Sequence, residues 1–94
     1  MEQKTILITG SSSGIGFECA KHFLKNGFRV VCVSRKETDI DGVINICGDI
    51  TDNVFLEELS YRLKEEIGRI DVLLNNAGVG MYGTWEDSRI EDIR

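Results

Sequence analysis

The fold is decided at residues 9–16, which read Thr9-Gly10-Ser11-Ser12-Ser13-Gly14-Ile15-Gly16. Residues 4–9 form a short apolar, β-branched run, as in a strand that is buried on both faces. Apolar residues then recur at helical spacing over residues 14–26, and Asn26-Gly27 is a suitable stop for a helix. A glycine-rich turn between a strand and a helix predicts an anion site, because the N–H groups at a helix start carry partial positive charge.

Each glycine of this turn has a predicted role. Gly10 permits the tight turn, Gly14 lets the backbone approach a pyrophosphate, and Gly16 lets the helix pack against the strand. A diphosphate is expected on the amides at the helix start and on the hydroxyls of Ser11 and Ser12. The predicted phosphate-binding residues are Gly10, Ser11, Ser12, Ser13, Gly14, Ile15 and Gly16. A turn of this kind taken alone is as often an ordinary turn, so the function needs further signals.

The rest of the chain alternates apolar runs with one more amphipathic segment. Further strands are expected at residues 29–34, 43–47 and 70–75, and a second helix at residues 52–67. Thr51 or Asp52 can cap this helix at its start. The residues expected on its inward face are Val54, Phe55, Leu59, Leu63 and Ile67.

Apolar strands that alternate with amphipathic helices predict the α/β class. The expected fold is a Rossmann-like, doubly wound parallel sheet with strand order 3-2-1-4, truncated after the fourth strand. The strand order reverses between the first and the fourth strands. Because ligands bind beyond the carboxyl ends at such a reversal, the glycine-rich turn and residues 75–78 are expected at the same mouth.

The composition indicates one small soluble domain. The 94 residues are 41% hydrophobic and 29% charged, with no proline and no apolar stretch long enough for a membrane span. The start of the chain lacks the long apolar region of a signal peptide, so a cytoplasmic location is expected. A net charge of -5 argues against a nucleic-acid partner, because phosphate-backbone binding needs a basic face.

The cysteines predict neither a disulfide framework nor a metal site. Cys19, Cys32 and Cys47 are widely spaced and form no C-x-x-C pair, and the only histidine is His22. Buried free thiols are the expected state, because reduced cysteine packs as a small hydrophobe.

A second motif, later in the chain, makes the interpretation of the glycine-rich turn more specific. Three residues separate the first two glycines, unlike the usual dinucleotide fingerprint, and Asn75-Asn76-Ala77-Gly78 follows much later in the chain. The two motifs together resemble the short-chain dehydrogenase/reductase family, over essentially all of the chain. The resemblance implies an NAD(P)-dependent oxidoreductase that transfers hydride between a carbonyl and an alcohol, with residues 1–94 as its N-terminal nucleotide-binding portion.

The resemblance also implies roles for residues outside the glycine-rich turn. Asp49 and Ile50 would hold adenine, and Asn76, Ala77 and Gly78 would border the ribose and nicotinamide. Asn75 is expected mainly to tie neighbouring strands together, with direct ligand contact as the alternative.

The end of the second predicted strand bears on the choice between NAD and NADP. An acidic residue there accepts from the ribose 2′-OH of NAD, whereas an arginine accommodates the 2′-phosphate of NADP. The sequence has Ser34-Arg35-Lys36, which offers a planar set of donors and a further charge. NADP is therefore the expected cofactor, although Ser13 stands where many NADP-binding members of the family place a basic residue.

No catalytic residue is identified in the chain. The family resemblance implies a Tyr-x-x-x-Lys pair and a serine, but Tyr61 is followed four residues later by Glu65, and Tyr82 by Glu86. The 94 residues alone are therefore predicted to be inactive. The alternatives are a stand-alone nucleotide-binding module without catalysis and a structural fragment.

The fourth predicted strand also raises the question of self-association. In the complete fold this strand lies inside the sheet, so residues 72–74 are expected to form an open edge here. Such an edge recruits another chain, and a two-fold pairing of this strand with its symmetry mate predicts a homo-oligomer. The alternative is that residues 81–94 fold back over the edge.

Overall fold

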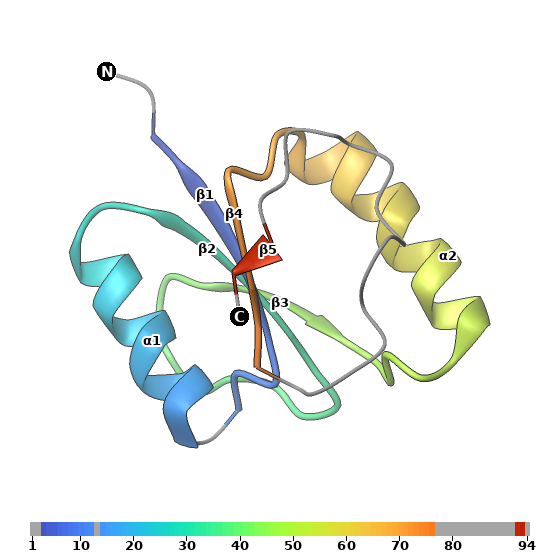
Figure 1. Ribbon diagram of the computed structural model, residues 1–94, viewed down its shortest axis with the longest axis horizontal. Helices are drawn as coiled ribbons and strands as arrows, with labels where there is room; N and C mark the ends of the chain where they lie inside the picture. Colours follow the sequence, from blue (N-terminus) through green and yellow to red (C-terminus); the bar gives the residue numbers. More distant parts are fainter. Residues whose placement is uncertain (1–2, 13, 77–91, 94) are drawn as a thin grey trace.

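The computed structural model describes residues 3–12, 14–76 and 92–93, and they form a parallel sheet between two helices (Figure 1). The sheet order is β3-β2-β1-β4-β5, and every neighbouring pair is parallel. The predicted order 3-2-1-4 is confirmed. The elements are β1 (Thr5–Thr9), α1 (Gly14–Lys25), β2 (Arg29–Ser34), β3 (Ile44–Cys47), α2 (Asn53–Arg62), the π-helical turn η1 (Leu63–Ile67), β4 (Val72–Asn75) and β5 (Asp92–Ile93).

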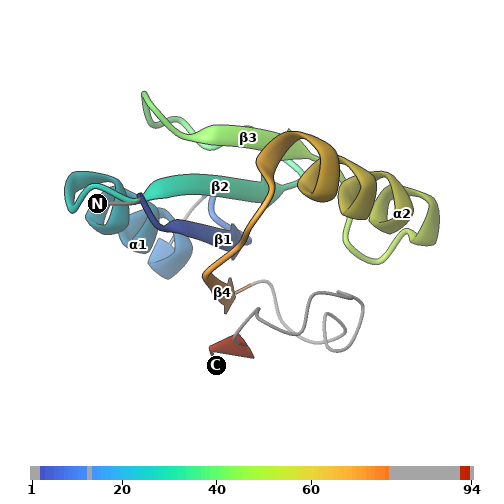
Figure 2. The same cartoon turned by 90° about the horizontal axis from the view of Figure 1, so that it is seen from above.

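The core forms two layers because the side chains of each strand alternate between the faces of the sheet. Leu7 of β1 packs with the helical residues Leu59 and Leu63 on one face. Ile6 and Ile8 pack with Ala20 of α1 on the other. The two helices therefore cover opposite faces, and Figure 1 shows them on opposite sides of the strands. Figure 2 shows the strands side by side in the order β3, β2, β1 and β4. No helix in the described part of the chain has the length and apolar character needed to cross a membrane.

The second helix begins as predicted but its inward face differs by one residue. Asp52 caps it, with a carboxylate oxygen that accepts from the Val54 N–H at 3.0 Å. Phe55 and Leu59 are buried as expected, but Val54 is 73% exposed and its assignment to the core was wrong. Residues four apart lie on one helical face, whereas a residue one position away lies about 100° around the axis.

The cysteines are free, but only Cys32 is buried. Cys19 is partly buried and Cys47 is exposed, so the expectation of buried thiols was wrong for Cys47. Its neighbour Ile46 packs in the layer under α2, and successive strand residues point to opposite faces. α1 lies over β1 and β2 and does not extend to β3, which leaves Cys47 without a cover.

The outer side of β4 is paired within the chain. β5 runs parallel to it, with Leu73 opposite Asp92 and Leu74 opposite Ile93. The expectation of an open edge was therefore wrong for these two residues, because β5 supplies partners for a strand edge that would otherwise be unpaired. The sequence also allowed the start of a third helix from Asp87, but Asp92 belongs to β5, and residues 77–91 lie outside the described residues.

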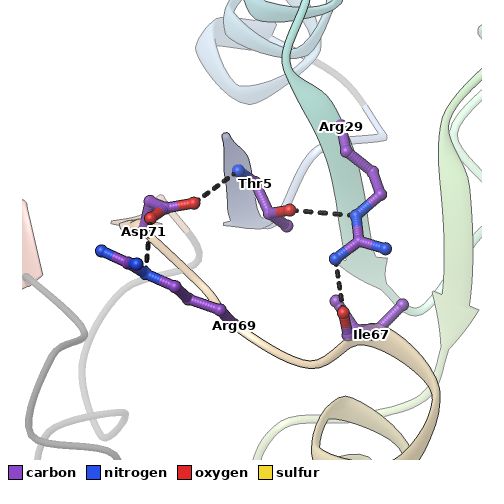
Figure 3. Close-up of polar contacts among 5 residues, drawn as sticks. All are labelled: Thr5, Arg29, Ile67, Arg69 and Asp71. Carbon is purple, nitrogen blue, oxygen red and sulfur yellow. Dashed lines mark hydrogen bonds and ion pairs between the residues drawn. The ribbon is translucent and has the colours of Figure 1, made fainter. Parts of the chain in front are cut away.

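A polar network joins the amino ends of β1, β2 and β4 (Figure 3). The Thr5 N–H donates to Asp71 Oδ2 at 2.8 Å, and Arg69 forms an ion pair of 2.9 Å with the other oxygen of Asp71. Arg29 Nε donates to Thr5 Oγ1 at 2.9 Å, and Arg29 Nη2 donates to the Ile67 carbonyl at the end of η1. The network therefore fastens η1 and two flanking strands to β1, at the end of the sheet opposite the glycine-rich turn.

Replacing Arg29 with methionine should lower the free energy of unfolding by about 2 kcal/mol, because hydrogen bonds made by charged groups contribute about 1.5–3 kcal/mol. Methionine keeps an apolar stem and removes only the donors. Arg62→Met is the matched control, since Arg62 makes an exposed ion pair of 3.3 Å with Glu66 that should contribute no more than about 1 kcal/mol. Urea unfolding measures both variants, and equal losses would contradict a structural role for Arg29.

Candidate functional site

A cavity of about 820 Å³ opens beside the carboxyl ends of β1, β2 and β3. The predicted site residues that line it are Gly10, Ser12, Ser34, Arg35, Lys36, Asp49 and Ile50. Glu37, Gly48 and Thr51 line it as well. Three loops that are far apart in the sequence therefore meet at one cavity, as a parallel sheet requires of its strand ends.

Backbone hydrogen bonds hold these loops against one another. The Gly10 N–H donates to the Val33 carbonyl at 2.9 Å, and the Gly48 N–H donates to the Ser34 carbonyl at 3.0 Å. Both bonds continue the strand pairing beyond the ends of the strands. The walls of the cavity are thus extensions of the sheet.

The backbone of the turn is of the kind that favours glycine at Gly10, Gly14 and Gly16. Gly10 and Gly14 have φ of 66° and 64°, in the left-handed region that favours glycine. A Cβ on Gly16 would lie 2.4 Å from the Gly10 carbonyl oxygen and 2.7 Å from Asn76 Nδ2, so no side chain fits. A Cβ on Gly14 would meet no other described residue within 4 Å, which is the space that a ligand needs.

The Thr9 side chain joins the glycine-rich turn to the end of β4. Its hydroxyl donates to Asn75 Oδ1 at 3.0 Å and accepts from the Asn76 N–H at 3.0 Å. Asn76 Nδ2 donates to the Gly10 carbonyl at 3.1 Å, so Asn76 spans both loops. Asn75 ties β4 to β1, and its Nδ2 is buried without an acceptor among the described residues. Asn75 therefore connects the two strands as expected. Its Nδ2 donor, unpaired within the described part of the chain, is also compatible with the alternative, a direct contact with a ligand.

The Ser11 hydroxyl points away from the position expected for a diphosphate. Ser11 is completely buried, and its oxygen lies 2.8 Å from Thr38 Oγ1. Burial raises the pKa of the neighbouring Cys32 thiol, although hydrogen bonds from Ser11 and Thr38 act in the opposite direction. We therefore assign the Ser11 hydroxyl a structural role and keep only its backbone N–H as a candidate for ligand binding.

Hydrogen bonds from Thr51 fix the position of the Asp49 carboxylate, which can accept a further hydrogen bond. Its Oδ1 accepts from the Thr51 N–H at 2.9 Å and from the Thr51 hydroxyl at 2.7 Å. These two bonds lower the pKa of the Asp49 carboxyl, and the nearby charge of Arg35 lowers it further. The carboxylate is exposed and ionised at neutral pH, which fits the predicted contact with the amino group of adenine.

Some predicted residues lie apart from this cavity or outside the described chain. Gly14 and Ile15 line a second hollow of about 490 Å³ along α1, where Ile15 is 73% exposed. The predicted residues Ser13, Ala77 and Gly78, like the aromatic Tyr82 and Trp85, lie outside the described residues. Tyr61 is exposed on α2. Among the residues that the structure describes, no group of three or more histidine, cysteine or acidic side chains is placed to hold a metal ion.

Three residues around the cavity have roles that the sequence did not reveal. Thr51 orients Asp49, while Thr38 and Asn45 fasten the connection between β2 and β3. Thr38 lies in a polar stretch without periodicity, and nothing in that stretch distinguishes a buried threonine from an exposed one. Asn45 interrupts an apolar strand, which was the one available signal that a polar partner lies beside it.

Comparisons with known proteins agree with this geometry. A family model described as short chain dehydrogenase matches residues 4–94. A probable short-chain type dehydrogenase/reductase of Helicobacter pylori is 37% identical over 93 residues, which are 94% of this chain and 34% of that protein. Meso-2,3-butanediol dehydrogenase of Serratia marcescens is 33% identical over 102 residues, which cover 99% of this chain and 41% of that protein. The chain thus spans about a third to two fifths of these relatives.

Solved structures give the same result. A short chain dehydrogenase from Leptospira borgpetersenii with bound NAD+ matches 83% of this chain and 32% of its own, with a TM-score of 0.75 and 29% identity. The aldohexose dehydrogenase of Thermoplasma acidophilum, in ligand-free form, matches 86% of this chain and 32% of its own, with a TM-score of 0.74 and 32% identity.

Proposed function

This chain belongs to the short-chain dehydrogenase family, and from that membership we propose that its cavity binds NADP(H) in preference to NAD(H). The observation that carries the proposal is the exposed Arg35, which lines the cavity directly after β2. Ser34 leaves that strand end without a carboxylate, and Lys36 adds a second positive charge on the same wall. A guanidinium offers the bidentate hydrogen bonds that a phosphate accepts well.

The residues that line the cavity fit the adenosine part of a dinucleotide, and the glycine-rich turn beside it offers backbone amides for the diphosphate. Gly14 carries no side chain, and among the described residues a Cβ there would meet nothing, which suits a diphosphate bound at the start of α1. We assign the adenine contact to Asp49 and Ile50, which line the cavity. We assign the ribose and nicotinamide side to Asn76, which is bonded to Gly10, and to Ala77 and Gly78, which lie outside the described residues. When bound, the cofactor supplies or receives the hydride.

The activity of the whole protein is a further part of the proposal. We assign it hydride transfer between a small carbonyl compound and the corresponding alcohol, because the chain has the nucleotide-binding part of this family. The inactivity of the 94 residues alone and a cytoplasmic location remain predictions. Self-association also remains one, but the open edge from which it was predicted is paired at Leu73 and Leu74.

Replacing Arg35 with alanine should lower the affinity for NADP about tenfold or more, because a charge-assisted bidentate pair contributes roughly 1.5–3 kcal/mol. The affinity for NAD should change little. Calorimetric titration of parent and variant with both cofactors measures the difference. Lys64→Ala is the control, since Lys64 is exposed on η1 and does not line the cavity.

Glu37 could instead give the cavity a preference for NAD. Its carboxylate lines the same cavity and would favour NAD by accepting from the ribose hydroxyls. Glu37→Gln should therefore leave the preference for NADP in place. A parent protein that prefers NAD, or an Arg35 variant that loses affinity for both cofactors equally, would overturn the proposal.

A further inference from the structure

Thr38 is a buried polar residue in a connection that has no helix of its own. It lies between β2 and β3 and is 1% exposed. Its N–H donates to Asn45 Oδ1 at 2.9 Å, and its carbonyl accepts from Asn45 Nδ2 at 3.1 Å and from the Ile40 N–H at 2.9 Å. Its hydroxyl lies 2.8 Å from Ser11 Oγ. Every polar group of Thr38 is thus engaged, although the residues on either side of it are exposed.

These hydrogen bonds fix one end of the segment that contains Arg35 and Lys36, the two positively charged residues of the cavity. Arg35, Lys36 and Glu37 lie between Ser34 and Thr38. At the other end, the Ser34 carbonyl accepts from the Gly48 N–H at 3.0 Å, and the Ser34 hydroxyl donates to the Lys36 carbonyl. The three charged residues therefore form a short segment, residues 35–37, that is fixed by hydrogen bonds at both ends. We call this segment the arch.

The Ser11–Thr38 hydrogen bond connects this arch to the glycine-rich turn. Ser11 belongs to the turn that is expected to hold the diphosphate, and Arg35 belongs to the arch that is expected to hold the 2′-phosphate. One ribose carries both groups at a fixed separation, so the two parts of the site must stand at a matching distance. Charge-assisted hydrogen bonds weaken steeply when donor and acceptor are misaligned.

We infer that Thr38 is a positioning residue, which sets the place of Arg35 relative to the glycine-rich turn and thereby the selectivity for NADP over NAD. The inference rests on the proposed preference for NADP. It assigns no ligand contact to Thr38, because the side chain is buried and its hydroxyl is already paired with Ser11. A fixed backbone also reduces the conformational entropy that Arg35 loses on binding.

The experiment compares Thr38→Val, which removes the hydroxyl at nearly equal volume, with Thr38→Ser, which keeps it. Calorimetric titration of the full chain with NADP and NAD should show the selectivity ratio falling about fivefold in Thr38→Val and staying near the parent value in Thr38→Ser. Adenosine 2′-monophosphate, which reaches only the Arg35 end, should bind the parent and Thr38→Val within about twofold of each other. A merely structural loss would weaken all three ligands together and would overturn the inference.

Ser11→Ala removes the same hydrogen bond from the other side and serves if Thr38→Val does not fold. It should lower the selectivity ratio to a similar extent, and the double variant should add nothing further, because the two side chains act through one bond. Additive effects would contradict the positioning role. Loss of the preference in Arg35→Ala, with the parent ratio kept in Thr38→Val, would overturn only the role of Thr38. A parent without preference for NADP would overturn the proposed function itself.

Discussion

Replacing Gly16 with alanine is expected to lower the free energy of unfolding by about 2 kcal/mol and to weaken cofactor binding at least tenfold. Gly16 lies inside α1, where alanine is favoured over glycine by about 1 kcal/mol, so helix propensity alone would predict a gain. The added methyl group, however, would stand 2.4 Å from the Gly10 carbonyl oxygen and 2.7 Å from Asn76 Nδ2. Either the helix moves away from β1 or the bond from Asn76 to Gly10 breaks, and both changes open the binding turn.

Gly27→Ala is the matched control for this substitution. Gly27 follows the other end of α1 with φ of 88°, and a Cβ there meets nothing within 4 Å. The control should lose about 1 kcal/mol through backbone strain and keep its affinity for the cofactor. Thermal unfolding and cofactor titration of both variants test the difference, and a Gly16→Ala protein as stable as the parent would show that this close approach is absent.

The second large effect is expected at Gly48, where alanine should cost about 3 kcal/mol of stability. A Cβ at this position would lie 2.1 Å from the ring of Phe55. That ring is only 9% exposed and belongs to the core layer under α2, so it has little room to move. A shift of Gly48 also moves Asp49, so the affinity for the cofactor should fall as well.

A compensating substitution makes this expectation specific. Phe55→Leu alone should destabilise the protein by about 1 kcal/mol, because it removes buried apolar volume. Combined with Gly48→Ala it should instead raise stability above that of Gly48→Ala alone, since the smaller side chain vacates the space that the methyl group needs. Chemical denaturation of the four proteins gives the coupling, and purely additive losses would contradict the contact between Gly48 and Phe55.

Local patterns were sufficient for the elements from β1 to β4. The apolar run at β2 was predicted with both of its ends, and the strand order followed from the alternation of strands and helices. Arg35 was assigned from its place at the end of the second predicted strand, whereas Asp49 was assigned from the family resemblance, and both line the cavity beside Gly10. The exposure of Val54 was missed because an apolar residue in the first turn of a helix fits several possible inward faces.

The sequence by itself determined the α/β class, the strand order and the place of the glycine-rich turn between a strand and a helix, because these follow from periodicity, from glycine and from the handedness of parallel connections. Only the tertiary structure decided that the Ser11 hydroxyl turns inward to Thr38, that Asn45 holds Thr38, and that β5 pairs with β4. Each of these depends on groups far apart in the chain. A hydroxyl or a strand edge takes whichever partner the packed fold brings within hydrogen-bonding distance, and no local pattern records which partner that is.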